Sequence, residues 1–333
     1  MVTSSRRSGE SNLQPPDGMP HHIVYLSHGG AGFHLQTRFS ILTLLDLLIQ
    51  QGREDVRVWN FTDRPEESVA HELVSTVPVS PGDIARFRGV LDDTHRIKLE
   101  VLRRAEAETG LPFIYVDSDT RWLRIPDEPF QKLVESSASS AGDPTRPVAY
   151  MHQVEYQISP DYFPHYHRLL QQEKARLLQW NLPAQEPWVM WNAGVLGIPA
   201  GARGLFEKAL AITDELLLVA KPRNWVEQAV MSLLMSSRFE LRPFQEWLVH
   251  YHSHGQTLPV VLQRLFQSLP PGLSVAQQAE EAARFPIRME ELIQIENLPA
   301  NRMKKLLAGA WKSCRKRWLD LRAARLRRGR DEG

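Results

Sequence analysis

Two aspartates that directly follow a short apolar stretch are the residues best placed to do chemistry. The stretch FIYV, residues 113–116, has the pattern of a buried strand, and Asp117 and Asp119 come immediately after it. Side chains two residues apart in extended backbone point the same way, so the two carboxylates converge and repel each other unless a cation offsets their charge. Paired carboxylates favour Mg2+ or Mn2+. The pair predicts a divalent-metal site at the carboxyl end of a strand, with a solvated turn as the alternative.

Three histidines at alternate positions provide further candidate ligands. They are His250, His252 and His254 in VHYHSHG, residues 249–255. In extended backbone they would share one face, and imidazole is a common ligand for Mn2+ and zinc. One histidine as the third ligand beside the carboxylates is the most economical interpretation. A zinc site made by all three and a wet strand edge are the alternatives.

Glycines mark two other stretches where a ligand could approach the backbone. Gly29, Gly30 and Gly32 follow a predicted strand and precede a predicted helix, which suits either a phosphate-contacting loop or a tight turn. The pattern is neither GxGxxG nor a P-loop. Asn192 and Gly194 interrupt the apolar run VMWNAGVLGIP. An Asn there needs partners for its amide, and a Gly in a strand marks close approach of a ligand or a bulge.

Glu227 has both a structural and a chemical interpretation. It lies in NWVEQAV, where Asn224 can cap a helix and Glu227 takes the capping-box position three residues later. The spacing by itself therefore explains Glu227 as a capping residue.

Strand-like and helix-like stretches alternate along most of the chain, which predicts a mostly parallel α/β sheet flanked by helices. We expect a disordered leader at 1–20, a catalytic domain at 21–260 and a helical C-terminal extension at 261–333. The expected strands are 23–27, 56–61, 113–116, 147–151, 188–196, 239–241 and 247–251. The expected helices are 35–51, 83–110, 162–180, 203–218, 224–236 and 274–328.

The end of the chain is strongly basic, although the 333-residue chain carries a net charge of only +1. Residues 302–330 hold twelve Lys or Arg against one Asp, so the rest of the chain is acidic overall. Apolar residues at steps of three and four trace one helical face here, and Trp311 and Trp318 suit a membrane interface. A basic helix packed on the domain is an equal alternative. Nucleic-acid binding is not expected, because nothing else in the chain supports it.

Cysteine content and hydropathy indicate the compartment. Cys314 is the only cysteine, so no disulfide framework forms, and this fits a reducing environment. No stretch reaches the roughly 18 apolar residues of a membrane span, and no apolar segment of a signal peptide follows Arg6 and Arg7. We expect a cytoplasmic protein, with the basic segment holding it at the inner face of a membrane.

Taken together, the order and spacing of these stretches resemble the GT-A class of nucleotide-sugar-dependent glycosyltransferases of the Asp-x-Asp type, over roughly 22–255. The chain departs from the pattern at HYHSHG, where relatives often have a His followed by Gly and Lys. It also has Glu227-Gln228 where an Asp or Glu pair is also seen. The resemblance implies a GT-A-like fold with a mostly parallel central sheet. The stretches that carry it are IVYLSHGGAG, FTDRP, HRIKLEVL, IYVDSDT, WNAGVLGIP, NWVEQAV and VHYHSHG.

The resemblance implies transfer of a sugar from a nucleotide-diphosphate donor to a glycan, lipid or other acceptor, with Mn2+ or Mg2+ as cofactor. It implies metal binding by Asp117, Asp119 and His250, with Asp117 also holding ribose or metal-bound water. Glu227 is the candidate base that activates the acceptor if the reaction inverts configuration. Asp117 is the second candidate catalytic residue. The implied donor-site residues are Ser27, Gly29, Gly30, Thr62, Asp63, Arg96, Lys98, Asn192 and Gly194, with Trp188 and Trp191 as candidates to stack on a sugar.

Two other functions fit parts of the pattern. A non-catalytic nucleotide-sugar-binding or polyanion-binding protein could keep the same fold. A haloacid-dehalogenase-type phosphatase also uses Asp-x-Asp after a strand, but with Thr or Val two places after the second Asp. Arg121 holds that position here, so we rank this phosphatase below the other two functions.

Overall fold

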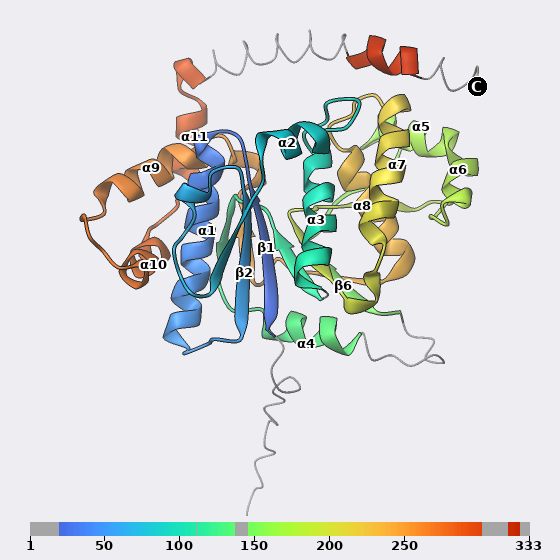
Figure 1. The fold of residues 1–333 in the computed structure, drawn as a ribbon. Coiled ribbons are helices and arrows are strands. Elements are labelled where there is room, and N and C mark those ends of the chain that lie inside the picture. The colour runs from blue at the N-terminus through green and yellow to red at the C-terminus, as the bar shows by residue number, and fades with distance from the viewer. Residues whose placement is uncertain (1–19, 111, 137–145, 302–318, 327–333) are drawn as a thin grey trace, which may run out of the picture.

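The computed structural model describes residues 20–110, 112–136, 146–301 and 319–326 (Figure 1). The predicted leader therefore lies outside the described residues, apart from Pro20. Most of the predicted basic amphipathic segment, 302–330, also lies outside them, and its described part, 319–326, is helical. Within the described ranges, no helix is both long enough and apolar enough to cross a membrane.

A seven-stranded sheet forms the centre of the molecule, in the order β3-β2-β1-β4-β9-β6-β10 (Figure 1). β1 pairs in parallel with β2 and β4, β2 with β3, and β6 with β10. Only β9 among these seven runs antiparallel to its neighbours, β4 and β6. The predicted mostly parallel α/β sheet is therefore confirmed. The strands are β1 His21–Ser27, β2 Val56–Thr62, β3 Val74–Pro78, β4 Phe113–Val116, β6 Val148–Met151, β9 Val195–Ile198 and β10 Glu240–Pro243.

β4 and β9 lack charged side chains, and β1 is apolar from Ile23 to Leu26, because both faces of the sheet are covered there. In β1, Val24 and Leu26 belong to one buried cluster, whereas Ile23 and Tyr25 belong to the other. Successive side chains of a strand point to opposite faces, so an unbroken apolar run is typical of a strand buried on both sides. β4 is buried on both faces in the same way, and the candidate carboxylates begin directly after its last residue, Val116.

Helices cover the two faces of the sheet (Figure 1). α3, α7 and α8 pack on one face, and α1 packs on the other together with α9, α10 and α11. The extension predicted at 261–333 begins inside α9, and Leu262, Leu265 and Ala279 share a core with α1; the division into two parts stays a prediction. The helices are α1 Ala31–Gln50, α2 Pro81–Phe87, α3 Arg96–Thr109, α4 Asp127–Glu135, α5 Pro164–Gln172, α6 Lys174–Gln179, α7 Leu205–Val219, α8 Val226–Arg238, α9 Leu258–Ser268, α10 Val275–Arg284 and α11 Met289–Glu296.

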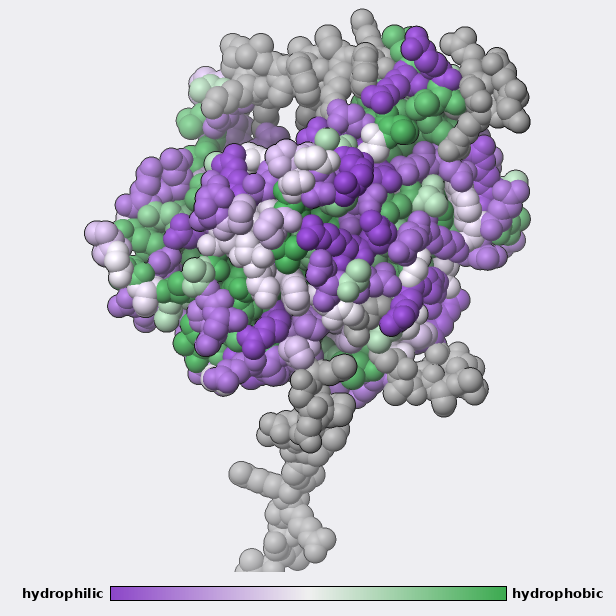
Figure 2. Space-filling model, in the orientation of Figure 1, coloured by the Kyte–Doolittle hydropathy of each residue, from purple (hydrophilic) through white to green (hydrophobic). Residues whose placement is uncertain are grey.

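The outer surface is mainly hydrophilic on the face that Figure 2 shows, where hydrophobic residues appear in small separate groups. This distribution follows from the two buried clusters, which take up most of the large apolar side chains of the described residues. Single exposed apolar residues are ordinary, whereas contiguous exposed apolar residues mark a place where a ligand or partner can bind.

Four expected elements are wrong in extent. The helix expected at 274–328 divides into α10 and α11 at 285–288, because Pro286 cannot continue α10 and Phe285 before it is extended; much of the remaining stretch lies outside the described residues. The helix expected at 83–110 is two helices, α2 and α3, because Gly89 and Asp92 between them adopt left-handed backbone with φ of 63° and 52°. The helix expected at 162–180 divides into α5 and α6 at Glu173. The strand expected at 188–196 is two strands of different sheets, β8 Trp188–Trp191 and β9, which the turn beginning at Asn192 separates.

Two small antiparallel pairs complete the fold at the edge where the parallel strands end. β5 Thr120–Trp122 pairs with β11 Leu248–His250, and their register sets His250 opposite Thr120. β7 Val154–Ile158 pairs with β8. The first pair brings a histidine from the last strand next to the turn that holds the two aspartates.

Candidate active site

The two aspartates lie in the short turn between β4 and β5, and backbone hydrogen bonds fix this turn on both sides. Asp117 N donates to the Gly194 carbonyl at 2.8 Å, and Tyr251 N donates to the Asp119 carbonyl at 2.8 Å. Thr120 Oγ1 donates to the Asp117 carbonyl at 3.0 Å. The backbone of the two aspartates is thus held by Gly194 of the Asn192 turn and by Tyr251, which follows β11.

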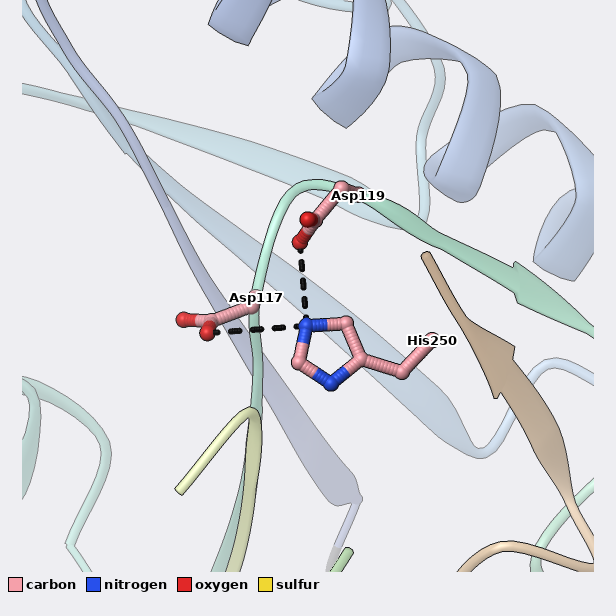
Figure 3. A group of neighbouring side chains, drawn as sticks. All are labelled: Asp117, Asp119 and His250. Carbon is pink, nitrogen blue, oxygen red and sulfur yellow. Dashed lines mark hydrogen bonds and ion pairs between the residues drawn. The ribbon is translucent and has the colours of Figure 1, made fainter. Parts of the chain in front are cut away.

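Asp117, Asp119 and His250 converge on one point (Figure 3). His250 Nε2 lies 3.1 Å from Asp119 Oδ1 and 3.9 Å from Asp117 Oδ2, and one ligand atom from each residue lies within 4.8 Å of the others. An octahedral ion with bonds of about 2.1 Å has neighbouring ligand atoms about 3 Å apart. The His250–Asp119 distance matches this spacing, whereas the Asp117 oxygen lies farther out, so Asp117 would have to move inward for one divalent cation to contact all three residues.

The protonation of this group follows from its charges. Burial alone would lower the pKa of His250, but its hydrogen bond with Asp119 and the charge of Asp117 outweigh burial and raise the pKa. Burial alone would raise the pKa of Asp119, but the His250 contact lowers it. Both shifts favour a proton on His250 beside the charged Asp119 carboxylate. A divalent ion would take over the role of the proton on His250.

The carbonyl oxygen of the Asn192 side chain orients His250. Asn192 Oδ1 lies 3.1 Å from His250 Nδ1 and also accepts from Gly194 N at 2.8 Å. Because Nδ1 contacts Asn192, His250 turns Nε2 toward the carboxylates. Histidines that bind metals commonly have their other ring nitrogen held by such a partner. A β-carbon on Gly255 would stand 2.9 Å from Asp119 Oδ2, so the absence of a side chain there leaves room for the carboxylate.

Lys98 joins this group to Glu227. Its Nζ lies 3.6 Å from Asp117 Oδ1, 3.3 Å from Glu227 Oε1 and 3.1 Å from the Ala193 carbonyl, which accepts a hydrogen bond. Burial lowers the pKa of Lys98, but Asp117 and Glu227 outweigh it and raise the pKa overall. Burial raises the pKa of Glu227, and Lys98 opposes that shift. Lys98 is therefore the fixed positive charge beside the carboxylates.

The predicted donor-site residues of the first two strands come together at the ends of β1 and β2. Their parallel register sets Ser27 opposite Thr62, next to Asp63. Asp63 Oδ2 accepts from Gly29 N at 2.9 Å, and Gly30 immediately precedes α1 as its N-cap residue. Exposed backbone N–H groups at the start of a helix favour a bound phosphate. The position of this loop is compatible with a donor site, although the structure itself assigns it no ligand.

Arg96 does not belong to this group. Its guanidinium donates to Asp214 at 2.7 Å and 3.0 Å, to Glu100 at 2.8 Å and to the Phe87 carbonyl at 2.8 Å. These bonds occupy Arg96 in tying α3 to α7 and to the end of α2. We therefore remove Arg96 from the candidate donor site.

The other two histidines of VHYHSHG do not share a face with His250. The backbone leaves the strand after His250 and forms a short 3-10 turn at His252–His254. His254 Nδ1 lies 3.1 Å from Glu296, and His252 Nε2 lies 3.6 Å from Glu155. The expected alternation is therefore wrong, and His250 is the histidine that lies with the carboxylates.

The two candidate stacking tryptophans differ in burial. Trp188 is buried in the core and donates from Nε1 to the Pro183 carbonyl, so core packing explains it. Trp191 packs against the same cluster but keeps part of its surface exposed, and its stacking on a sugar stays a prediction.

Sequence reasoning missed several polar residues around the site. His152 is buried with its ring edge-on to His250 at 5.2 Å between centroids, and burial with the two nearby histidines lowers the pKa of His152 to about 3. Tyr115 donates from its hydroxyl to Asp117 Oδ1 at 2.7 Å. Glu155 Oε2 accepts from Gln228 Nε2 at 2.6 Å. His152 could have been found, because it directly follows β6 at the edge of the sheet where ligands bind.

Comparison with known proteins gives distant structural likenesses only. No protein-family model and no curated protein matches the chain. The apo structure of the bifunctional glycosyltransferase WbbM is 13% identical over 87% of this chain, with a TM-score of 0.40, and the match spans 52% of that chain. Galactosyltransferase LgtC, in complex with donor and acceptor sugar analogs, is 11% identical, with 82% and 99% of the two chains covered and a TM-score of 0.38. An active-site mutant of LgtC is 12% identical over 64% and 70%, with a TM-score of 0.33. Function is therefore argued from the side chains.

Proposed function

We propose that this chain is a metal-dependent glycosyltransferase that moves a sugar from a nucleotide-diphosphate donor to a hydroxyl acceptor. The observation that carries the proposal is the convergence of Asp117, Asp119 and His250 at the carboxyl end of β4. This group lies at the sheet edge where open α/β sheets bind ligands, as does the loop from Ser27 to Gly30.

The roles of the donor-site residues follow from charge. A bound Mn2+ or Mg2+ would act as a Lewis acid on the diphosphate leaving group. Asp117, Asp119 and His250 would hold the ion, and Tyr115 keeps Asp117 oriented through its hydrogen bond. Lys98 adds a fixed positive charge where negative charge develops on the leaving group.

The remaining donor contacts come from two regions. The backbone N–H of Gly30 is the proposed phosphate contact, and Asp63 is the proposed contact to ribose or base. Gly29 N–H donates to Asp63 and Thr62 is fully buried, so we propose that these two residues shape the site by holding Asp63 and the end of β2 in place. Gly194, with the Asn192 side chain beside it, lines the proposed place of the donor sugar.

Glu227 is the proposed base that activates the acceptor if the reaction inverts configuration. It is 5% exposed, and its Oε1 lies 3.3 Å from Lys98 Nζ. A buried carboxylate at this position can take a proton from an acceptor hydroxyl. Burial also raises the pKa of Glu227, which brings it closer to the pKa of an effective base at neutral pH.

The basic segment 302–330 suggests where the enzyme works. We propose that it binds an anionic membrane surface from the cytoplasmic side, which would favour a lipid-linked acceptor. Flotation with anionic liposomes, comparing the full chain with a form that lacks 302–330, tests this directly. Equal flotation of the two forms would contradict it.

One observation favours a second candidate, a non-catalytic nucleotide-sugar-binding or polyanion-binding protein. Two of the carboxylates already have a basic partner in the protein, His250 for Asp119 and Lys98 for Glu227. Calorimetric titration with UDP-sugars and GDP-sugars, with and without Mn2+, followed by product analysis, separates the two. Binding with neither hydrolysis nor transfer across a broad acceptor panel would favour the binding protein.

The haloacid-dehalogenase-type phosphatase is the weakest candidate. Arg121 stands where such an enzyme needs Thr or Val, and its guanidinium donates to the Ala283 and Phe285 carbonyls. The side chain thus ties the turn after the aspartates to the end of α10, which is a structural role.

A further inference from the structure

Three aromatic rings form a continuous, partly exposed row beside the candidate active site, and we call it the aromatic strip. Tyr156 of β7 lies 4.8 Å from Phe163, just before α5, and Phe163 lies 5.0 Å from Trp225, just before α8. Tyr156 is 42% exposed and Trp225 is 40% exposed. Tyr166 is buried beneath them, 6.1 Å from Phe163 and 6.4 Å from Trp225. The three rings thus rest on a fixed base and turn part of their surface to solvent.

The strip is connected to the candidate active site through both of its outer residues. Tyr156 follows Glu155, whose carboxylate accepts from Gln228 and lies 3.6 Å from His252. Trp225 stands two residues before Glu227, the proposed base. The Glu155–Gln228 hydrogen bond thus brings the residue next to Tyr156 into contact with the residue next to Glu227, so the strip lies near the proposed base.

The chemistry of this region suits a sugar ring. The face of an aromatic ring carries negative partial charge, which attracts the positively polarised C–H groups on the flat side of a pyranose. Binding sites combine such apolar area with a few polar groups that fix orientation. Glu155 accepts hydrogen bonds and Gln228 and His252 offer polar atoms, so they match the hydroxyls at the edge of a sugar. A lipid tail in the same place would offer these groups no hydrogen bond beyond those they make with one another, and it would remove their remaining polar surface from water at a cost in free energy.

We propose that the aromatic strip binds a pyranose ring of the acceptor and delivers its hydroxyl toward Glu227. The proposal rests on the proposed function, since it adds the acceptor side to the same centre. It commits to a carbohydrate as the group that contacts the protein, whether that carbohydrate is free or linked to a lipid.

The test measures glycoside binding without any donor. Methyl β-lactoside, methyl β-maltoside and methyl N-acetyl-β-lactosaminide are titrated by saturation-transfer NMR, with and without UDP and Mn2+. We expect at least one to bind the wild-type chain, and Tyr156→Ala to weaken its binding about three- to tenfold, the range expected for one lost aromatic contact. Tyr156→Phe keeps the ring and should stay within about twofold. Trp225→Leu is a second variant with the same expected loss.

Tyr162→Ala is the matched control, because Tyr162 is 75% exposed next to the strip but makes no ring contact with it among the described residues. It should bind as the wild type does. Binding of no glycoside to the wild type, or equal binding by Tyr156→Ala, would overturn the proposal. A wild-type chain that binds a glycoside but neither UDP nor Mn2+ would instead contradict the proposed function, while the proposed sugar binding by the strip would stand.

Discussion

The imidazole of His250 occupies the space that a side chain on Gly194 would fill. A β-carbon on Gly194 would stand 2.1 Å from His250 Cε1 and 2.4 Å from Nδ1, far inside van der Waals contact. His250 can therefore reach the carboxylates because residue 194, in the Asn192 turn, has no side chain.

The first prediction is that Gly194→Ala weakens Mn2+ binding at least about tenfold, because the added methyl group displaces His250 from Asp119. Isothermal titration with Mn2+ measures the effect. Gly201→Ala is the matched control, since nothing lies within 4 Å of a β-carbon there. Retention of wild-type affinity by Gly194→Ala would mean that His250 is not a ligand.

The second prediction concerns the orientation of the same histidine. Asn192→Ala removes the oxygen that lies 3.1 Å from His250 Nδ1, and it should reduce Mn2+ affinity by about 10- to 100-fold. Asn192→Asp keeps an acceptor oxygen in place and should recover most of the affinity. If the Ala and Asp variants bind Mn2+ equally, the hydrogen bond does not orient the ligand.

How much of this site the sequence predicts depends on whether the contacts are local. Asp117 and Asp119 are recognisable because an apolar strand and the acidic pair are adjacent in the chain. Ser27 and Thr62 are brought together by the parallel register of neighbouring strands, which the alternation of elements also predicts. By contrast, His250 meets Asp119 across 131 positions through the pairing of β11 with β5, and only the folded structure shows which of three histidines arrives there.

Other features were beyond sequence reasoning for the same reason. The contact of Lys98 with Glu227 joins the first turns of two helices far apart in the chain, so no spacing rule indicates it. Gly89 and Asp92 divide the expected helix at 83–110 because both adopt left-handed backbone, which Asp takes up less readily than Gly.

A third prediction tests the Lys98–Glu227 pair as a unit. Lys98→Met leaves a buried carboxylate without its cation and should cost about 3–5 kcal/mol of unfolding free energy. Glu227→Gln in the same chain should restore part of that stability, since the buried Glu227 charge is removed, while the partly exposed Asp117 loses its Lys98 contact but keeps its hydrogen bond from Tyr115. Urea unfolding of the two single variants and the double variant gives the coupling energy. Strictly additive losses would show that the two side chains do not depend on each other.

A fourth prediction concerns pH and His21 at the start of β1. Burial, against the nearby Phe130 ring at 4.2 Å, lowers the pKa of His21, although Asp55 opposes the shift. A histidine with a lowered folded-state pKa favours folding above its unfolded pKa of about 6.5 and loses that contribution as pH falls below it. His21→Phe should therefore lose less stability between pH 7.5 and pH 5 than the wild type. An equal loss in urea midpoints would contradict this.

The central claim is that Asp119 holds a divalent ion at a sugar-transfer centre. The most direct test is Mn2+-dependent hydrolysis of a panel of UDP-sugars and GDP-sugars by the wild type, Asp119→Asn and the control Asp161→Asn, which changes an exposed aspartate. The account predicts that the wild type and Asp161→Asn hydrolyse at least one donor only with Mn2+. It also predicts that Asp119→Asn, with an unchanged melting temperature, does not. Equal turnover by Asp119→Asn, or turnover that does not depend on Mn2+, would contradict the account.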